Sequence, residues 1–194
     1  MTNFSKYAVA AIVLLSFLPL GYQFLNQEMN AEEIFAANFT TEKITDFNNQ
    51  RNTDVSKVKT PEEVEMAKSV LIRSKAIISY NEKKYPEAIN LFKSHLASDT
   101  NIKNKSKVEL YLAKSYLADN KLVEAKETLK KIIKEGKNSL KQEAEWYLVL
   151  TLIKENNVEQ AKKGLNRILL SQTSSAHKKK ALKLQQQIDK NYVL

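Results

Sequence analysis

The sequence predicts an all-α fold: an α-solenoid in which helical hairpins stack side by side and a last helix caps the row. Three alanines, Ala88, Ala125 and Ala161, recur at intervals of 37 and 36 residues, and a unit of this length with two helical stretches is typical of stacked helical arrays. Glycine and proline are scarce, with three of each among 194 residues, which argues against a β-sandwich or barrel with its many turns. Lysine, glutamate, leucine and alanine, which favour helices, dominate after residue 60.

Each of the three alanines lies in the same local pattern. A large apolar side chain follows it after four residues: Phe92, Leu129 and Leu165. A small side chain lets two helix axes approach to roughly 8–9 Å. We therefore expect these six residues to form the packing contacts of the repeats.

The array is expected to begin at Thr60. Thr60 can cap a helix, Pro61 suits the first helical position, and Glu63 completes a capping box. The repeat domain then covers residues 60–194. Within it we expect helices over about 61–81, 105–118, 122–135 and 175–191. Another helix begins at 85 and ends before a loop at 99–104, and Gly136 ends the helix over 122–135. Two more helices begin after the caps Ser139 and Asn157.

Three helices of this domain have distinctive patterns. The first carries an apolar face with spacings of three and four residues: Val64, Ala67, Leu71, Ser74 and Ile78. The fifth has almost no polar side between Trp146 and Ile153, so we expect it to lie centrally, covered by the sixth helix and the last one. The last helix would hide the final apolar face of the array with Ala181, Leu184 and Ile188.

This arrangement resembles the tetratricopeptide repeat (TPR) family over about residues 67–170, plus the capping helix to residue 191. The first helix of such a repeat carries a small residue that faces its partner helix, which Ala76 and Ala113 match and Val149 matches loosely. The three repeats are degenerate, because they are longer than usual, lack the closing proline, and place large side chains where a small one is usual: His95, Ile132 and Ile168.

The resemblance implies a concave groove, lined by the first helices of the repeats, that holds a peptide or a partner's helix. The residues projected onto this groove are Arg73, Ile77, Tyr80, Lys107, Leu110, Lys114, Leu117, Trp146, Leu150 and Lys154. Apolar residues with interspersed Arg and Lys suit a segment that has apolar anchors and carboxylates. The alternative is that Trp146 and Leu150 belong to the core.

The amino end has the pattern of a membrane anchor. The stretch from Tyr7 to Leu25 has no charge and is long enough, as a helix, to cross the ~30 Å hydrocarbon core. Lys6 before it predicts that residues 1–26 hold the chain in the inner membrane with the repeat domain on the periplasmic side. The alternative is a cleaved signal peptide, although no small-x-small cleavage site follows the run. An anchor followed by a short repeat domain also resembles bacterial envelope accessory proteins.

Residues 27–59 are expected to be a polar linker with one short helix. Asn30 can cap this helix, with Glu33 as its reciprocal partner. Ile34, Phe35 and Phe39 would then form a small apolar patch. Two interpretations stay open for this patch: a docking peptide for another protein, or a segment that folds back onto the array.

The net charge of +9 is concentrated toward the carboxyl end, where residues 162–190 hold eight Lys or Arg against one acid, Asp189. Such a region can attract an acidic partner or anionic lipid, or it can be a solvated surface. Aromatic residues for stacking on bases are missing there except for Tyr192, which argues against nucleic acid as a partner.

Catalytic and cofactor motifs are absent from the sequence. There is no cysteine, and the two histidines, His95 and His177, have no second ligand at metal-binding spacing. No glycine-rich phosphate loop or nucleophile turn occurs. We therefore expect no enzyme activity, no cofactor and no metal, but a membrane-anchored adaptor or scaffold that binds protein in its groove. The alternative is a structural accessory subunit of an envelope or translocon-type membrane complex.

Overall fold

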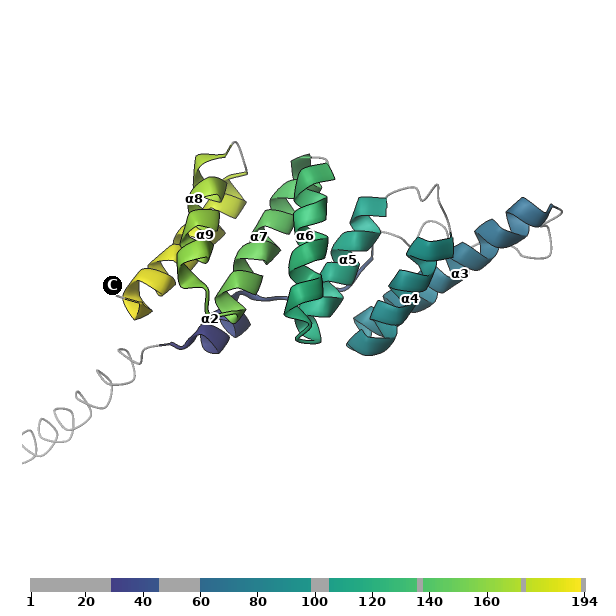
Figure 1. The fold of residues 1–194 in the computed structure, drawn as a ribbon, viewed down its shortest axis with the longest axis horizontal. Helices are drawn as coiled ribbons and strands as arrows, with labels where there is room; N and C mark the ends of the chain where they lie inside the picture. The colour runs from purple at the N-terminus through teal and green to yellow at the C-terminus, as the bar shows by residue number, and fades with distance from the viewer. Residues whose placement is uncertain (1–28, 46–59, 99–104, 136–137, 172–173, 193–194) are drawn as a thin grey trace, which may run out of the picture.

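A computed structural model describes residues 29–45, 60–98, 105–135, 138–171 and 174–192 of the chain, and these ranges form eight α-helices (Figure 1). The fold is all-α. Consecutive helices from α3 onward run antiparallel and pack against one another in a row, and α2 packs against α7 and α9. The helices are α2 (Ala31–Asn38), α3 (Pro61–Asn81), α4 (Tyr85–Ser98), α5 (Lys105–Ala118), α6 (Leu122–Glu135), α7 (Asn138–Lys154), α8 (Val158–Leu170) and α9 (Ser175–Asn191).

The helix ends follow the capping residues of the sequence. Thr60 Oγ1 accepts from the Glu63 amide at 3.2 Å, and the Glu63 carboxylate accepts from the Thr60 amide at 3.0 Å. Asn30 and Glu33 make the same reciprocal pair, and Asn157 caps α8. The predicted cap Ser139 is wrong, because α7 already begins at Asn138 and places Ser139 in its first turn. The predicted loop at 99–104 and Gly136 lie outside the described residues.

The same turn closes the first helix of each of three hairpins, α3–α4, α5–α6 and α7–α8. Lys83, Asn120 and Asn156 all have positive φ, at 62°, 59° and 57°. The amide of the following residue donates at 2.8 Å to a carbonyl five residues before it, in the pairs Lys84–Ser79, Lys121–Tyr116 and Asn157–Leu152. These turns recur at the 37- and 36-residue intervals of the alanines. The backbone is therefore repeat-like independently of the side-chain pattern.

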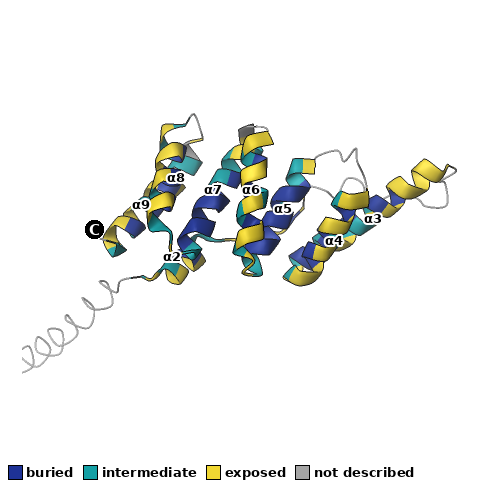
Figure 2. Cartoon of the chain, viewed as in Figure 1, coloured by how far each residue is buried: buried dark blue, intermediate teal, exposed yellow. Residues whose placement is uncertain are grey.

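The interior of the row is a continuous apolar core. Figure 2 shows buried residues along α5 and α7, with exposed residues on the outer sides of the helices. All six residues of the alanine pattern are fully buried: Ala88, Phe92, Ala125, Leu129, Ala161 and Leu165. Close packing at α7 and α8 uses a different small residue. A Cβ added to Gly164 would lie 2.7 Å from Val149 Cγ2, so Gly164 makes room for the larger side chain at the loosely matched position.

The apolar face predicted for the first helix is wrong at three of its positions. In α3, Val64, Leu71 and Ile78 are 41%, 55% and 50% exposed, and the buried face is formed by Ala67, Ser69, Arg73, Ala76, Ser79 and Tyr80. A sequence period reveals the angular spacing of apolar residues on a helix, but it does not show whether a neighbour covers them.

The equivalent positions in the later hairpins explain this exposure. Val108 and Ala144 correspond to Leu71, and Ser115 and Thr151 correspond to Ile78, by the same 37- and 36-residue intervals. All four are fully buried. Helices α5 and α7 have the second helix of the preceding hairpin beside them, whereas no helix of the described chain precedes α3 in the row.

The carboxyl end of the row is covered. Helix α7 is buried on nearly all sides, as its apolar sequence predicts, and it packs against α6, α8, α5 and α2. Helix α9 packs on α8 and buries Ala181, Leu184 and Ile188. The expected cover of α7 by the last helix is supplied mainly by α2 instead.

None of the helices in the described ranges is long and apolar enough to cross a membrane. The predicted anchor from Tyr7 to Leu25 lies outside these ranges.

Candidate protein-binding surface

Residues 29–45, here called the strap, lie along the side of the row formed by the first helices of the hairpins. Beyond α2 the chain continues behind α6 toward α5 in Figure 1 and reaches the carboxyl end of α3. The patch at Ile34 and Phe35 is buried against the row. Of the two interpretations of this patch, the structure therefore has the segment folded back onto the array.

The helical part of the strap is held by two side chains of α7. The Lys154 ammonium lies 4.4 Å from the ring centroid of Phe35 and 3.2 Å from a carboxylate oxygen of Glu32. The ring of Tyr147 meets Phe39 edge-on at 6.1 Å between centroids. Tyr147 and Lys154 are seven residues apart, about two helical turns, so one face of α7 makes both contacts. This face binds an aromatic pair and a carboxylate together.

The extended part of the strap is held through its backbone. The Ile44 amide donates to Asn81 Oδ1 at 2.8 Å, and Asn81 Nδ2 donates to the Ile44 carbonyl at 3.1 Å. The Tyr85 hydroxyl donates to Thr41 Oγ1 at 3.2 Å. The Ile44 side chain is buried. The α3–α4 hairpin thus holds the far end of the strap.

The near end of the strap is joined to α9. The Met29 amide donates to Asn191 Oδ1 at 2.6 Å, and Asn38 Nδ2 donates to Gln187 Oε1 at 2.9 Å. One segment of 17 residues therefore contacts α7 and α9 as well as the α3–α4 hairpin at the opposite end of the row from α9.

A layer of tyrosines and one lysine lies on the same side of α3, α5 and α7. The ring centroids of Tyr80 and Tyr111 are 5.9 Å apart. The Lys114 ammonium lies 4.9 Å from the ring centroid of Tyr147 and 5.4 Å from that of Tyr111. The Lys114 side chain is buried and forms an ion pair with Glu143 at 3.6 Å. The tyrosines of this layer have an apolar body and a polar tip, and tyrosine is common at protein interfaces.

Burial changes the acidity of two tyrosines in this layer. It raises the pKa of Tyr80 and of Tyr147 well above the ordinary value, because the phenolate would lose its hydration. The carboxylates of Glu143 and of Glu42, which belongs to the strap, raise the pKa of Tyr147 further. The hydroxyl of Tyr80 is buried and has no hydrogen-bond partner among the described residues.

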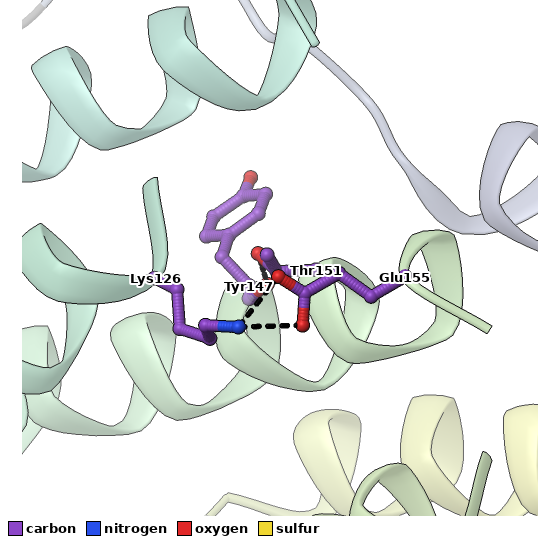
Figure 3. Close-up of polar contacts among 4 residues, drawn as sticks. All are labelled: Lys126, Tyr147, Thr151 and Glu155. Carbon is purple, nitrogen blue, oxygen red and sulfur yellow. Dashed lines mark hydrogen bonds and ion pairs between the residues drawn. The ribbon is translucent and has the colours of Figure 1, made fainter. Parts of the chain in front are cut away.

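A separate ion pair joins the carboxyl end of helix α7 to helix α6 (Figure 3). The Lys126 ammonium on α6 lies 2.6 Å and 2.7 Å from the two carboxylate oxygens of Glu155. The Thr151 hydroxyl donates to the Tyr147 carbonyl at 2.8 Å. The ring of Tyr147 points away from the ion pair. Tyr147 is thus presented by a helix whose carboxyl end is tied to α6.

The residues projected onto a groove do not form one open surface. Tyr80, Lys114 and Lys154 belong to the tyrosine layer or contact the strap directly. Leu117 and Leu150 are fully buried and offer no surface to a partner in this structure. Of the others, Arg73, Leu110 and Trp146 are buried, and Ile77 and Lys107 are half-buried.

The sequence reasoning missed three residues that hold the strap, Asn81, Tyr85 and Tyr147, and it also missed Tyr111 of the tyrosine layer. Tyr111 and Tyr147 are 36 residues apart and occupy equivalent places in α5 and α7. This register could have identified the pair. Nothing in the sequence links Asn81 to Ile44, because that contact depends on the path of the strap.

A cavity of about 550 Å³ opens between the strap, the amino-terminal half of α7 and α9. Its lining carries both signs of charge, with Glu42 and Glu143 opposite Lys180 and Lys183, and Trp146 forms part of it. Elsewhere in the basic region, Lys162 pairs with Asp189 at 2.7 Å and Lys163 with Glu159 at 2.7 Å. Part of the basic charge is therefore compensated locally.

His95, one of the two histidines, has a packing role. Its Nδ1 lies 2.9 Å from Ser69 Oγ, which joins α4 to α3 in the interior. Among the described residues, no three His, Asp or Glu side chains form a group that could hold a metal ion.

Comparison with protein-family models, with curated proteins and with solved structures finds nothing that matches this chain.

Proposed function

We propose that the chain is a non-enzymatic protein-interaction module of TPR-like architecture, and that it binds a segment of a partner protein on the first-helix side of the row. The proposal is carried by one observation: this side of the row accommodates the strap, a short helix followed by an extended piece, through contacts to four helices. Three hairpins closed by the same turn support the TPR-like assignment.

The chemistry of the surface supports a partner with aromatic anchors and carboxylates. Lys154 contacts an aromatic ring and a carboxylate at once, and Tyr147 offers its ring edge to a second aromatic residue. Asn81 forms hydrogen bonds with the backbone amide and carbonyl of one extended residue, and the side chain of that residue is buried. Helix-in-groove and extended-peptide recognition both use such contacts.

The proposal includes the membrane anchor from Tyr7 to Leu25, with the row on the periplasmic side of the inner membrane. Leu25 precedes Met29, the first residue of the strap, by only four positions. The anchor would hold the row close to the membrane surface. The module would then act as a scaffold or adaptor for proteins of that membrane or of the periplasm.

The test is photo-crosslinking in intact cells. A photoreactive residue replaces Ile77 or Lys107, which are half-buried on the first-helix side, and in a matched control it replaces Lys130, which is exposed on α6. We expect adducts with the same partner proteins from residues 77 and 107, identified by mass spectrometry, and none of these from residue 130. Adducts that do not differ between the two sides would contradict the proposal.

A second candidate function is favoured by the exposed apolar residues of α3. A structural accessory subunit of an envelope or translocon-type complex would use Val64, Leu71 and Ile78 as a permanent contact with a neighbouring subunit. In that case Leu71→Lys would abolish co-purification of fixed partners in detergent, and Lys154→Glu would leave it unchanged. If the chain is an interaction module instead, Lys154→Glu should abolish co-purification of the partner and Leu71→Lys should leave it unchanged.

A further inference from the structure

We propose that the strap is a resident competitor of the partner: residues 29–45 occupy the binding surface in cis, and a partner binds by displacing them with a segment of the same chemistry. This inference rests on the proposed function. The partner segment would be a short acidic helix with two aromatic anchors, followed by an extended piece.

The contacts of the strap are those of a bound peptide. Its helix α2 has eight residues, and a helix of this length is marginal in water unless it docks onto something else. Among the described residues, the hydrogen bonds between the strap and the row run between backbone and side chain or between two side chains. The strap therefore depends on the row, and side-chain contacts decide how tightly it is held.

The surface beneath the strap is suited to being vacated. Tyr147 meets Phe39 of the strap, and Lys114, Tyr111 and Tyr80 continue this layer of rings and an ammonium group along the first helices. Such side chains pack against apolar groups when covered and keep a hydrated tip when exposed. A layer of leucines would instead favour a permanent cover.

The strap itself specifies the partner's pattern. The carboxylate of Glu32 and the ring of Phe35 meet Lys154, and Phe39, four residues later, stacks on Phe35 at 4.9 Å and meets Tyr147. The partner segment would thus carry an acidic residue three positions before the first aromatic residue and a second aromatic residue four positions after it. Its extended continuation would form hydrogen bonds with Asn81 through its backbone and would carry an apolar residue at the place of Ile44, whose side chain is buried.

The experiment uses the full-length chain and a fluorescent peptide with the sequence of residues 29–45. A tethered competitor acts at an effective concentration of about 1 mM. Full release of the strap should therefore tighten peptide binding by about tenfold for a peptide with a dissociation constant near 0.1 mM, and partial weakening should tighten it by less. Two variants weaken the strap: Glu32→Lys, which reverses one exposed charge, and Phe35→Asp, which removes a buried anchor. Fluorescence anisotropy measures the affinity, and circular dichroism checks the fold.

Matched variants locate the binding. In the otherwise wild-type chain, Lys154→Glu repels Glu32 of the strap and Glu32 of the peptide alike, because both would meet the new carboxylate. A peptide that itself carries Glu32→Lys should therefore bind this variant more tightly than the unchanged peptide does. Lys163→Glu, on the exposed side of α8, should change nothing. If Phe35→Asp unfolds the chain, the affinity of the peptide for the Glu32→Lys chain, compared with its affinity for the wild type, alone tests the competition.

Two results would overturn the inference. If the peptide binds the wild-type chain and the folded variants equally, the surface binds segments without competition from the strap, and the proposed function stands without this inference. If the peptide binds none of the chains, strap-like segments are not ligands of this surface. The photo-crosslinking at residues 77 and 107 then tests the proposed function separately.

Discussion

At the carboxyl end of the row, α9 lies over α8 and α2 lies over α7, whereas at the amino end α3 leaves its outer face open (Figures 1 and 2). Leu71 and Ile78 on that open face are about half exposed, while the equivalent Val108 and Thr151 are fully buried. Each hairpin obtains part of its burial from the hairpin before it, as expected of a stacked row. The same sequence position is therefore core or surface according to its neighbours.

The largest effect is expected from introducing a charge at equivalent positions of the two regions. Val108→Lys places an uncompensated ammonium in the core and should lower the free energy of unfolding by about 3–5 kcal/mol. Leu71→Lys, at the matched position of α3, should change it by less than about 0.5 kcal/mol, because the ammonium faces water. Chemical denaturation of both variants measures the difference. Equal losses of unfolding free energy in the two variants would contradict the difference between the two ends of the row, because they would mean that the face of α3 with Leu71 is covered.

A smaller effect is expected where helices approach through small residues in the middle of the row. Ala125→Leu should overpack a fully buried position and cost about 1–3 kcal/mol. Thermal unfolding of the variant, monitored by circular dichroism, gives the loss. An unchanged melting temperature would count against packing through these alanines. Ala88→Leu in the open-ended hairpin should cost a similar amount, since Ala88 is equally buried.

The covered end allows a sharper test through a pair of residues. Gly164→Ala should lower the free energy of unfolding by about 1 kcal/mol, because crowding against Val149 exceeds the gain in helix propensity. In the background of Val149→Ala the same change should become stabilising, since the crowding is gone. A double-mutant cycle from denaturation curves measures this coupling. Additive effects would contradict a direct contact between the two positions.

The smallest effect concerns Tyr147 beneath the strap and Tyr80 in α3. Their folded-state pKa values are raised, so the folded chain keeps protons that the unfolded chain loses above about pH 10. Their contribution to stability is therefore fully present below about pH 10 and is lost as the pH rises through the folded-state values. Denaturation between about pH 8 and pH 11 should show a shallower decline for Tyr80→Phe and Tyr147→Phe than for the wild type. Identical pH profiles would contradict the burial of these hydroxyl groups.

The helices and three of their capping residues could be predicted from sequence because their causes are local, whereas the predicted cap Ser139 was wrong. Thr60 with Glu63, Asn30 with Glu33, and the position of Asn157 depend on a few neighbouring residues. The exposure of Leu71 and Ile78 could not be predicted, since it depends on a neighbouring hairpin, and the described residues hold none before α3 in the row.

The surface that we propose for binding could be predicted only in part. Lys114 and Lys154 were expected on it, because the repeat register places them on first helices. Tyr147 and Asn81 were missed, since their role follows from where residues 29–45 lie. That segment was itself open to two interpretations, because three apolar side chains give no indication of the surface against which they pack.

The occupation of the first-helix side by residues 29–45 is tested most directly by zero-length crosslinking of the native full-length chain in dilute solution. A carbodiimide joins a lysine to a carboxylate in contact with it, and mass spectrometry identifies the linked peptides. We expect a bond between Glu32 and Lys154, 3.2 Å apart, together with the reference bonds Lys126–Glu155 and Lys131–Glu109 within the row. Formation of both reference bonds without the bond between Glu32 and Lys154 would contradict the account.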